Sequence, residues 1–387
     1  WARMMAARFC PSAWIAAGLG SGLGSGLSSG LSSGRSKCLS FARTNAIPAF
    51  LWVVAFASTI AFGFFSRVDY SGYKAAKVAL IQPNSDPWIG GIASSRRDYE
   101  TLVRLSDEAR AKNPDLSLVV WPETAFVPRI DWHWRYREDP DSFALVSDLL
   151  GYLDESNVPF VIGNDDAIVG RNSFGELGRV DYNAALLFRP GLNVMPPNPD
   201  RYRKMRLVPF TEHFPYRKSF PWVYDLLVAN DTHFWESGDD PVVFRAGDLS
   251  FSTPICFEDT FGYISRDFVV HGARAIVNMT NDAWAKNEAC QYQHLAMSVF
   301  RGVENRVPVV RAAASGQTCY IDPNGEIRAM AKPFAEEWLA VSVPLIPEGT
   351  VAPYTRYGDW FGVGFAVLAA VLLLLGMLTK IRHLYDN

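Results

Sequence analysis

Two long stretches without a charged residue, residues 47–65 and 360–378, most constrain what this chain of 387 residues can fold into. A helix rises about 1.5 Å per residue, so each stretch would reach roughly 28 Å, close to the thickness of a hydrocarbon core. A helix buried in a protein core is the alternative. We expect two transmembrane helices with a large domain between them, at residues 66–357.

Basic residues lie on the outer side of each apolar stretch. Arg35, Lys37 and Arg43 precede the first stretch, and Lys380 and Arg382 follow the second. Lys and Arg are concentrated on the cytoplasmic side of membrane spans. The sequence therefore predicts that both outer flanks are cytoplasmic, including a tail at residues 379–387, and that the domain lies on the far side of the membrane.

Residues 1–46 form a third kind of segment. A glycine-serine repeat with a period of four occupies residues 18–34. Such a repeat is typical of a flexible linker, although small residues at this spacing also permit close helix packing. We expect either a low-complexity segment or part of an N-terminal membrane region.

Composition argues against several kinds of ligand. The formal net charge is -3, with no basic excess that would indicate a nucleic-acid partner. The five cysteines are odd in number and lack Cys-x-x-Cys pairs, which argues against a disulfide framework or a cysteine zinc site. The six histidines show no metal-binding spacing. We expect no metal, no cofactor and at least one free thiol.

Between the apolar stretches, short β-rich runs alternate with helical patterns, which is typical of an α/β or layered α-β-β-α domain. Apolar residues at helical spacing predict helices at about residues 95–112 and 288–306. No linker-like break divides the region, so one domain is expected. The predicted strands lie within residues 78–84, 116–123, 159–165, 183–188, 250–258, 274–282, 308–313, 318–327 and 338–345.

Three reactive side chains follow β-rich runs. Glu123, Lys204 and Cys256 supply a carboxylate, a cation and a thiol, which are the groups that a cysteine nucleophile needs as base, oxyanion stabiliser and attacking atom. Spacing in the sequence cannot show that they meet. From the residues alone, a buried structural cysteine and two surface charges remain an alternative interpretation.

Five motifs in order carry a resemblance that favours the catalytic interpretation. The chain resembles the nitrilase superfamily and, within it, the apolipoprotein N-acyltransferase family, from about residue 78 to the last apolar stretch. The motifs are WPET (121–124), YRKMRLVPFTEHFP (202–215), PICFED (254–259), NMTNDAW (278–284) and QHLAMSVFRGVENRVPVVRAAASG (293–316).

The resemblance implies a nitrilase-like α-β-β-α sandwich and a role for each matched residue. Glu123 matches the general base, Lys204 the catalytic lysine and Cys256 the nucleophile. Glu212 matches a second active-site glutamate, and Glu258 the acid two positions after the cysteine, although structural roles for both remain open. Supporting residues would also include Phe257, which stands where tyrosine is common. His294, Asn278, Asn281 and Asp282 are expected to support packing and a turn behind the site.

The implied reaction moves a fatty acyl chain from a phospholipid donor, through a cysteine thioester, to the amine of a diacylglyceryl-modified apolipoprotein. The resemblance also implies a location in the bacterial inner membrane, where the protein would cross the bilayer several times and contact membrane lipids. The catalytic domain would lie in the periplasm. A membrane-tethered carbon-nitrogen hydrolase and an inactive truncated homologue are the alternatives. Family members carry several helices before this domain, whereas one such stretch is evident here, and Ala314 replaces a usual asparagine.

Overall fold

The computed structural model describes residues 46, 49–87, 89–230, 232–283, 285 and 287–385. The chain divides into two compact units, Trp1–Arg67 and Val68–Asn387. Within the described part of the first unit, Ala49–Phe65 forms a short apolar helix. Nearly all of the predicted low-complexity region at residues 1–46 lies outside the described residues.

The second unit contains two six-stranded sheets, ordered β12-β1-β2-β3-β4-β5 and β11-β10-β9-β8-β7-β6. Each has three adjacent parallel strands, β1 to β3 and β7 to β9, with antiparallel strands outside them. The strands are β1 (Ala75–Gln82), β2 (Leu116–Val120), β3 (Phe160–Arg171), β4 (Leu177–Phe188), β5 (Asp200–Arg203), β6 (Phe244–Ala246), β7 (Leu249–Ser252), β8 (Ala275–Thr280), β9 (Val309–Ala313), β10 (Cys319–Ile321), β11 (Ile327–Met330) and β12 (Glu337–Pro344).

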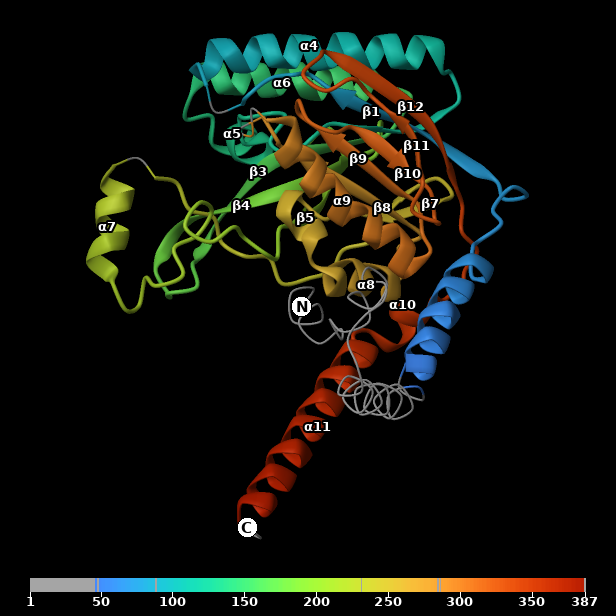
Figure 1. The fold of residues 1–387 in the computed structure, drawn as a ribbon. Helices are drawn as coiled ribbons and strands as arrows, with labels where there is room; N and C mark the ends of the chain where they lie inside the picture. Colours follow the sequence, from blue (N-terminus) through green and yellow to red (C-terminus); the bar gives the residue numbers. More distant parts are fainter. Residues whose placement is uncertain are drawn as a thin grey trace, which may run out of the picture. The chain divides into compact units, whose positions relative to one another are not determined.

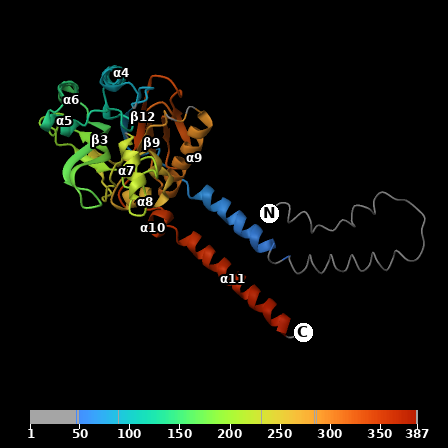
Figure 2. The ribbon, with the colours of Figure 1, turned by 90° about the vertical axis from the view of Figure 1, so that its left-hand side faces the viewer.

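Helices cover the outer face of each sheet, so the layers run α-β-β-α (Figures 1 and 2). Over the first sheet lie α4 (Gly91–Lys112), α5 (Ile130–Tyr136) and α6 (Pro140–Glu155). The second sheet is covered by α8 (Gly262–Val270) and α9 (Glu288–Asn305). The predicted sandwich is therefore present.

Strand alternation explains why the two sheets face each other. Val78 and Leu80 of β1 belong to the core shared by the sheets, whereas Ala79 and Ile81 belong to the core beneath α4 and α6. Successive side chains of a strand point to opposite faces, so an entirely apolar strand is buried on both sides. A continuous apolar run thus selects a central strand of a layered sandwich.

The structure corrects the predicted strand at residues 250–258. Strand β7 ends at Ser252, and a 3-10 helix, η1 (Cys256–Thr260), carries the rest of the motif. The predicted strand at 318–327 is also divided, into the hairpin strands β10 and β11. Local β propensity does not reveal where an apolar run leaves a sheet. Cys256 consequently lies in a turn and not within a strand.

Two helices, of which the second is largely apolar, end the described part of the chain. After α10 (Pro353–Tyr357), helix α11 (Trp360–Tyr385) contains a stretch, Trp360–Leu378, with a mean hydropathy of 2.6 and no burial. Among the described residues this is the one helix long and apolar enough to cross a membrane. The predicted span at residues 47–65 is described only as the shorter helix Ala49–Phe65.

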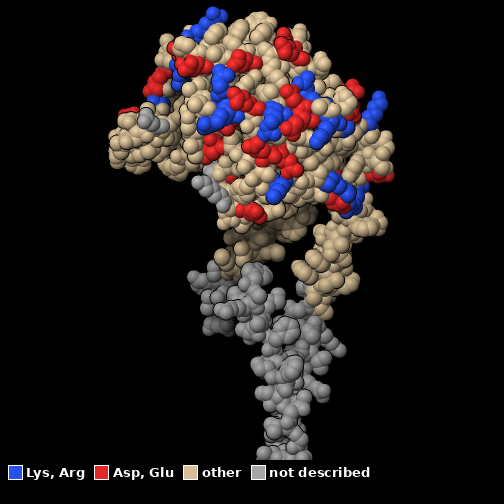
Figure 3. All heavy atoms as spheres, turned by 90° about the horizontal axis from the view of Figure 1, so that it is seen from above, with Lys and Arg blue, Asp and Glu red and all other residues tan. Residues whose placement is uncertain are grey.

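A separate helix, α7 (Pro221–Ala229), has no buried residue and projects from the sandwich on a long loop (Figure 1). Acidic and basic side chains alternate over the face of the domain seen in Figure 3, and no basic patch gathers there. The exposed residues of α7 and its loop include several large apolar side chains, among them Phe210, Tyr216, Phe220, Trp222 and Leu226.

Candidate active site

Chain segments that leave three strands position the predicted triad. Glu123 follows β2 of the first sheet, Lys204 directly follows β5 of the same sheet, and Cys256 opens η1 beyond β7 of the second sheet. Ligands of α/β proteins commonly bind at the carboxyl ends of parallel strands. Because the sheets are stacked, the segments after β2 and β7 meet at one edge of the sandwich.

A buried cluster of one cation and two carboxylates forms there. Lys204 Nζ donates to Glu212 Oε1 over 2.7 Å and to Glu123 Oε1 over 3.2 Å. The Lys204 side chain is completely buried, and those of Glu123 and Glu212 are nearly so. Glu212 Oε2 also accepts a bond from the Val208 backbone N–H, at 2.8 Å, which fixes the glutamate against the loop after the lysine.

The two carboxylates keep Lys204 charged. Burial by itself would lower the pKa of Lys204, but the charges of Glu123 and Glu212 outweigh it and hold that pKa well above the ordinary value. A permanently protonated ammonium is a donor that can stabilise an oxyanion without a prior proton transfer.

Two further donors fix the orientation of Glu123. Asn183 Nδ2 donates to Glu123 Oε1 over 2.8 Å, and the Asn281 backbone N–H donates to Oε2 over 2.8 Å. Asn183 was not identified from the sequence. The sequence does contain an indication of its role, because Asn183 stands at the start of the apolar run of β4. A buried amide at such a position requires a polar partner. Asn281 serves the site through its backbone, as a turn residue.

Cys256 sits in an uncommon backbone conformation, with φ of 50°. Such left-handed values are rare for residues other than glycine and persist only when the surroundings enforce them. Burial, followed by the charge of Glu123, raises the pKa of the Cys256 thiol well above its usual value, while Lys204 and a hydrogen bond from Thr280 act in the opposite direction. The resting group is a thiol, which requires a base before it can attack.

Glu258 joins the nucleophile turn to the lysine segment. Its carboxylate accepts bonds from the Tyr202 hydroxyl at 2.8 Å and from the backbone N–H groups of Ile255 at 2.8 Å, Met205 at 2.7 Å and Arg206 at 2.9 Å. Burial raises the pKa of Glu258 to about 7, against the effect of those donors. These contacts give Glu258 a positioning role, because they tie the segments of two sheets together.

Phe257, the other supporting residue predicted, is half-buried in η1. Its ring packs edge-on against Phe261, with ring centroids 5.0 Å apart, and its carbonyl accepts a 2.8 Å bond from Thr260. The backbone N–H of Phe257 is the one that follows the nucleophile. The side chain therefore contributes to the shape of the turn.

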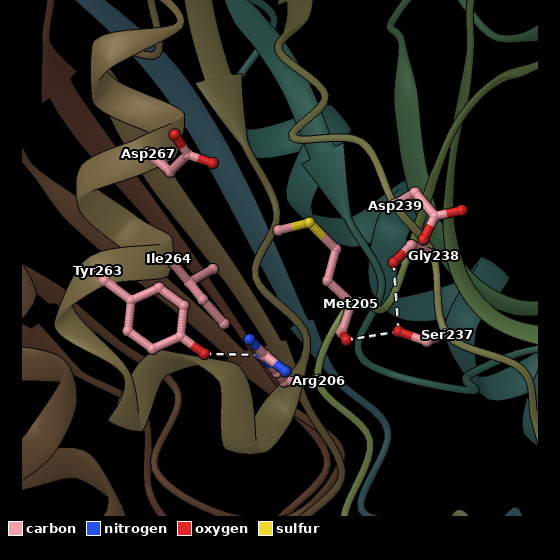
Figure 4. Close-up of a pocket in the computed structure, with 8 residues that line it drawn as sticks. All are labelled: Met205, Arg206, Ser237, Gly238, Asp239, Tyr263, Ile264 and Asp267. Atoms are coloured by element: carbon pink, nitrogen blue, oxygen red, sulfur yellow. Dashed lines mark hydrogen bonds between the residues drawn. The ribbon is translucent and has the colours of Figure 1, made fainter.

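A surface cleft of about 330 Å³ borders the lysine segment (Figure 4). In it, Arg206 Nε donates to the Tyr263 hydroxyl over 2.6 Å, and Ser237 Oγ donates to the Met205 carbonyl over 2.6 Å. The backbone N–H of Gly238 donates to the Lys204 carbonyl over 2.8 Å. The cleft thus lies against the backbone that carries Lys204, and Cys256 is not among its lining residues.

The arrangement brings together a thiol, a carboxylate and a positive charge, which are the groups that acyl transfer through a covalent intermediate requires. The thiol, the carboxylate and the positive charge belong to the side chains of Cys256, Glu123 and Lys204. Within the part of the chain that the structure describes, no group of three or more His, Cys, Asp or Glu side chains is arranged to hold a metal ion.

The chain is similar to known proteins over most of its length. A family model described as carbon-nitrogen hydrolase matches residues 77–355. Apolipoprotein N-acyltransferase 1 of Treponema pallidum (strain Nichols) is 54% identical over 316 residues, which cover 82% of this chain and 57% of that protein. Apolipoprotein N-acyltransferase 1 of Treponema denticola is 50% identical over 339 residues, covering 86% and 61%. The chain spans about three fifths of the length of these curated relatives.

A solved structure from Saccharomyces cerevisiae, a member of branch 10 of the nitrilase superfamily, aligns with a TM-score of 0.48 and 18% identity, covering 72% of this chain and 93% of that one. Family membership rests on the sequence matches, since the family model covers most of the chain. The chain belongs to the carbon-nitrogen hydrolase family, and over most of its own length it is similar to curated apolipoprotein N-acyltransferases.

Proposed function

We propose that the protein transfers a fatty acyl chain from a phospholipid ester to the N-terminal amine of a diacylglyceryl-modified lipoprotein. The observation that carries this proposal is the buried Lys204, which is hydrogen-bonded to Glu123 and Glu212. The charges of Glu123 and Lys204 also act on the pKa of the Cys256 thiol. The identity to two apolipoprotein N-acyltransferases supports the substrate class.

In the first half-reaction, Glu123 accepts the thiol proton as the sulfur of Cys256 attacks the ester carbonyl. Lys204 and the backbone N–H of Phe257 then stabilise the oxyanion. Collapse of the tetrahedral intermediate breaks the carbon–oxygen bond, and Glu123 returns the proton to the leaving lysophospholipid alkoxide. The product is an acyl thioester on Cys256.

In the second half-reaction, the amine of the acceptor attacks the thioester carbonyl. Glu123 takes a proton from the attacking nitrogen, the carbon–sulfur bond breaks, and the Cys256 thiolate recovers that proton. An amide has then formed, and the enzyme is in its starting state. Lys204 remains charged throughout, because its pKa lies far above neutrality.

The exposed apolar loop supports a substrate that resides in lipid. Phe210 is 60% exposed and Trp222 is 67% exposed. The same loop is joined to the site, since the Trp235 backbone N–H donates to the Glu212 carbonyl over 2.9 Å. Each buried methylene of a fatty chain favours the bilayer by about 0.8 kcal/mol, so both substrates remain at the membrane. An apolar surface beside the site allows the enzyme to reach them.

We also propose the membrane arrangement. Residues 47–65 and 360–378 would cross the inner membrane, residues 66–357 would lie in the periplasm and residues 379–387 in the cytoplasm. The hydropathy and exposure of Trp360–Leu378 support the second span, and the basic flanks support the orientation.

A transfer assay tests the proposed function. The full chain in detergent micelles is incubated with radiolabelled phospholipid and a synthetic diacylated lipopeptide, and the products are separated by chromatography and mass spectrometry. We expect label in an amide on the lipopeptide, none with Cys256→Ala, and normal transfer with Cys290→Ala, since Cys290 is an exposed cysteine outside the site. Label released only as free fatty acid would instead favour a hydrolase.

A further inference from the structure

Behind the nucleophile turn, Arg311 of β9 is completely buried, although it carries a permanent charge. A buried guanidinium is stable only when it is paired and hydrogen-bonded. Its two terminal nitrogens reach four separate segments of the chain. Nη1 contacts Asp259 Oδ2 at 2.6 Å, Asn278 Oδ1 at 2.9 Å and Ser298 Oγ at 3.0 Å, and Nη2 contacts Asp282 Oδ2 and His294 Nδ1, each at 2.8 Å.

Two of these contacts lead directly to Cys256. Asp259 lies three positions after the nucleophile in η1, and Asn278 of β8 donates from Nδ2 to the Pro254 carbonyl at 3.1 Å and to the Cys256 carbonyl at 3.4 Å. A single nitrogen of Arg311 therefore holds both sides of the turn. One route runs through the side chain of Asp259, and the other through the amide of Asn278.

The remaining contacts fix the frame itself. His294 of α9 contacts Asp259 Oδ1 through Nε2 at 2.9 Å and Asp282 Oδ1 through Nδ1 at 3.1 Å. Arg311 holds the pKa of Asp282 well below its usual value despite burial, and the two carboxylates raise the pKa of His294 to about 9 despite burial and the nearby guanidinium. The frame thus pairs Arg311 and His294 with the carboxyl groups of Asp259 and Asp282.

The turn requires such a frame, because a left-handed backbone at Cys256 is unfavourable unless its neighbours enforce it. Asp282 also acts on the thiol, since its negative charge raises the pKa of Cys256. Removing Arg311 would leave Asp259 and Asp282 with His294 as their shared partner, and the frame would carry an excess of negative charge. Both the geometry and the acidity of the thiol would then change.

We infer that Arg311 is a positioning residue for the nucleophile, which sets the turn of Cys256 through Asp259 and Asn278 and neutralises the acids behind it. The predicted packing role of His294 and the predicted turn role of Asn278 and Asp282 are parts of this one frame. The inference rests on the proposed acyl transfer, in which Cys256 is the attacking atom.

The first test measures single-turnover acylation by phospholipid in Arg311→Lys, which keeps the charge but loses the planar fork. We expect the rate constant to fall roughly 10²-fold, as small misplacements of a nucleophile do. The donor concentration at half-maximal rate should change by less than about two-fold, because binding is untouched. The matched control is Arg328→Lys, because Arg328 lies on β11, away from the turn, and pairs there with Asp322. A loss found entirely in donor affinity would overturn the inference.

The second test measures alkylation of Cys256 by iodoacetamide against pH, in protein whose other four cysteines are replaced. The charged groups acting on this thiol are Glu123, Lys204 and Asp282. With Arg311→Met, the half-maximal pH should move upward, because the loss of one positive charge leaves the frame more negative and disfavours the thiolate. If Arg311→Met does not fold, Asn278→Ala keeps the charges and should slow acylation with little movement of the profile.

Alkylation does not require acyl transfer, so the two proposals can fail separately. If the unaltered protein transfers no acyl chain but Arg311→Met still displaces the alkylation profile, the positioning role stands and the proposed function falls. If Arg311→Met alkylates with an unchanged profile, or Asn278→Ala acylates at the normal rate, Arg311 does not position the nucleophile.

Discussion

At the scale of single residues, the site is organised around the buried ammonium of Lys204. Asn183 donates to both carboxylate partners of Lys204. Glu123 is also held by the Asn281 backbone, and Glu212 by the loop after the lysine. Removing one partner of a buried ion pair leaves the others uncompensated. We therefore expect Lys204 to contribute to folding stability and, in the proposed reaction, to stabilise the oxyanion.

We expect Lys204→Met to slow acylation by roughly 10²- to 10³-fold, the usual effect of losing one preorganised donor. The melting temperature should fall as well, because Glu123 and Glu212 would lose their shared cation. The control is Lys77→Met, which removes a surface pair with Asp115 and should leave both quantities nearly unchanged. A folded Lys204→Met protein with a normal acylation rate would show that the oxyanion lies elsewhere.

Glu258 gives a prediction about pH. Burial raises its pKa from 4.5 to about 7, so the folded protein favours the protonated form. The contribution of this group to stability is complete below about pH 4.5 and is lost as the pH rises through about 7. We expect the melting temperature of the unaltered protein, relative to that of Glu258→Gln, to fall between pH 5 and pH 8. A difference that is constant or grows with pH would contradict this.

At the scale of elements, close packing between strands and turns decides where the triad lies. Gly163 of β3 has no side chain to separate it from the turn of Glu123, and a Cβ there would lie 2.2 Å from the Pro122 carbonyl oxygen and 2.6 Å from Glu123 Cα. Such distances are impossible without backbone movement. The strand and the base-bearing turn are therefore packed in direct backbone contact.

Gly163→Ala should accordingly displace Glu123, lowering both the acylation rate and the melting temperature. Gly170→Ala on the same strand is the matched control, because a Cβ there would meet only Ile168 at 3.5 Å, an ordinary contact. Both variants are measured by differential scanning fluorimetry and single-turnover acylation. Equal behaviour of the two would mean that the packing of β3 does not position the base.

Most of the central strands could be predicted from the sequence, but the turn at Cys256 and the partners of the buried polar residues could not. Apolar runs located the central strands of both sheets, because burial on both faces leaves a continuous pattern. The 3-10 turn at Cys256 falls within a predicted strand, because the tertiary contacts of this turn, from Asn278 to Cys256 and from Arg311 to Asp259, leave no local pattern in the sequence. Asn183 and Arg311 belong to strands whose pattern is apolar, and only the fold shows what their polar groups contact.

At the scale of the whole molecule, the proposed topology places a lipid-facing site outside the cytoplasm. A cysteine in place of Asp240, in a protein otherwise free of cysteine, should react with an impermeant maleimide added to intact spheroplasts. A cysteine in place of Asn387 should be protected until the membrane is permeabilised. The opposite pattern would place the domain in the cytoplasm, where the proposed lipoprotein reaction does not fit.

The sandwich and the family were accessible from sequence motifs at this scale, because collinear motifs constrain the whole chain. The membrane arrangement depends on hydropathy and flanking charge alone, and within the described residues one helix, Trp360–Leu378, has the length and composition of a span. The labelling experiment therefore tests the proposed orientation.

The central claim is that Cys256 carries the acyl group. The most direct measurement is the intact mass of the full chain after incubation with phospholipid and no acceptor. We predict an added mass of one acyl chain that is retained in Cys290→Ala, absent in Cys256→Ala and removed by neutral hydroxylamine, which cleaves a thioester but not an amide. An acyl adduct that persists in Cys256→Ala, or that resists hydroxylamine, would contradict the covalent mechanism.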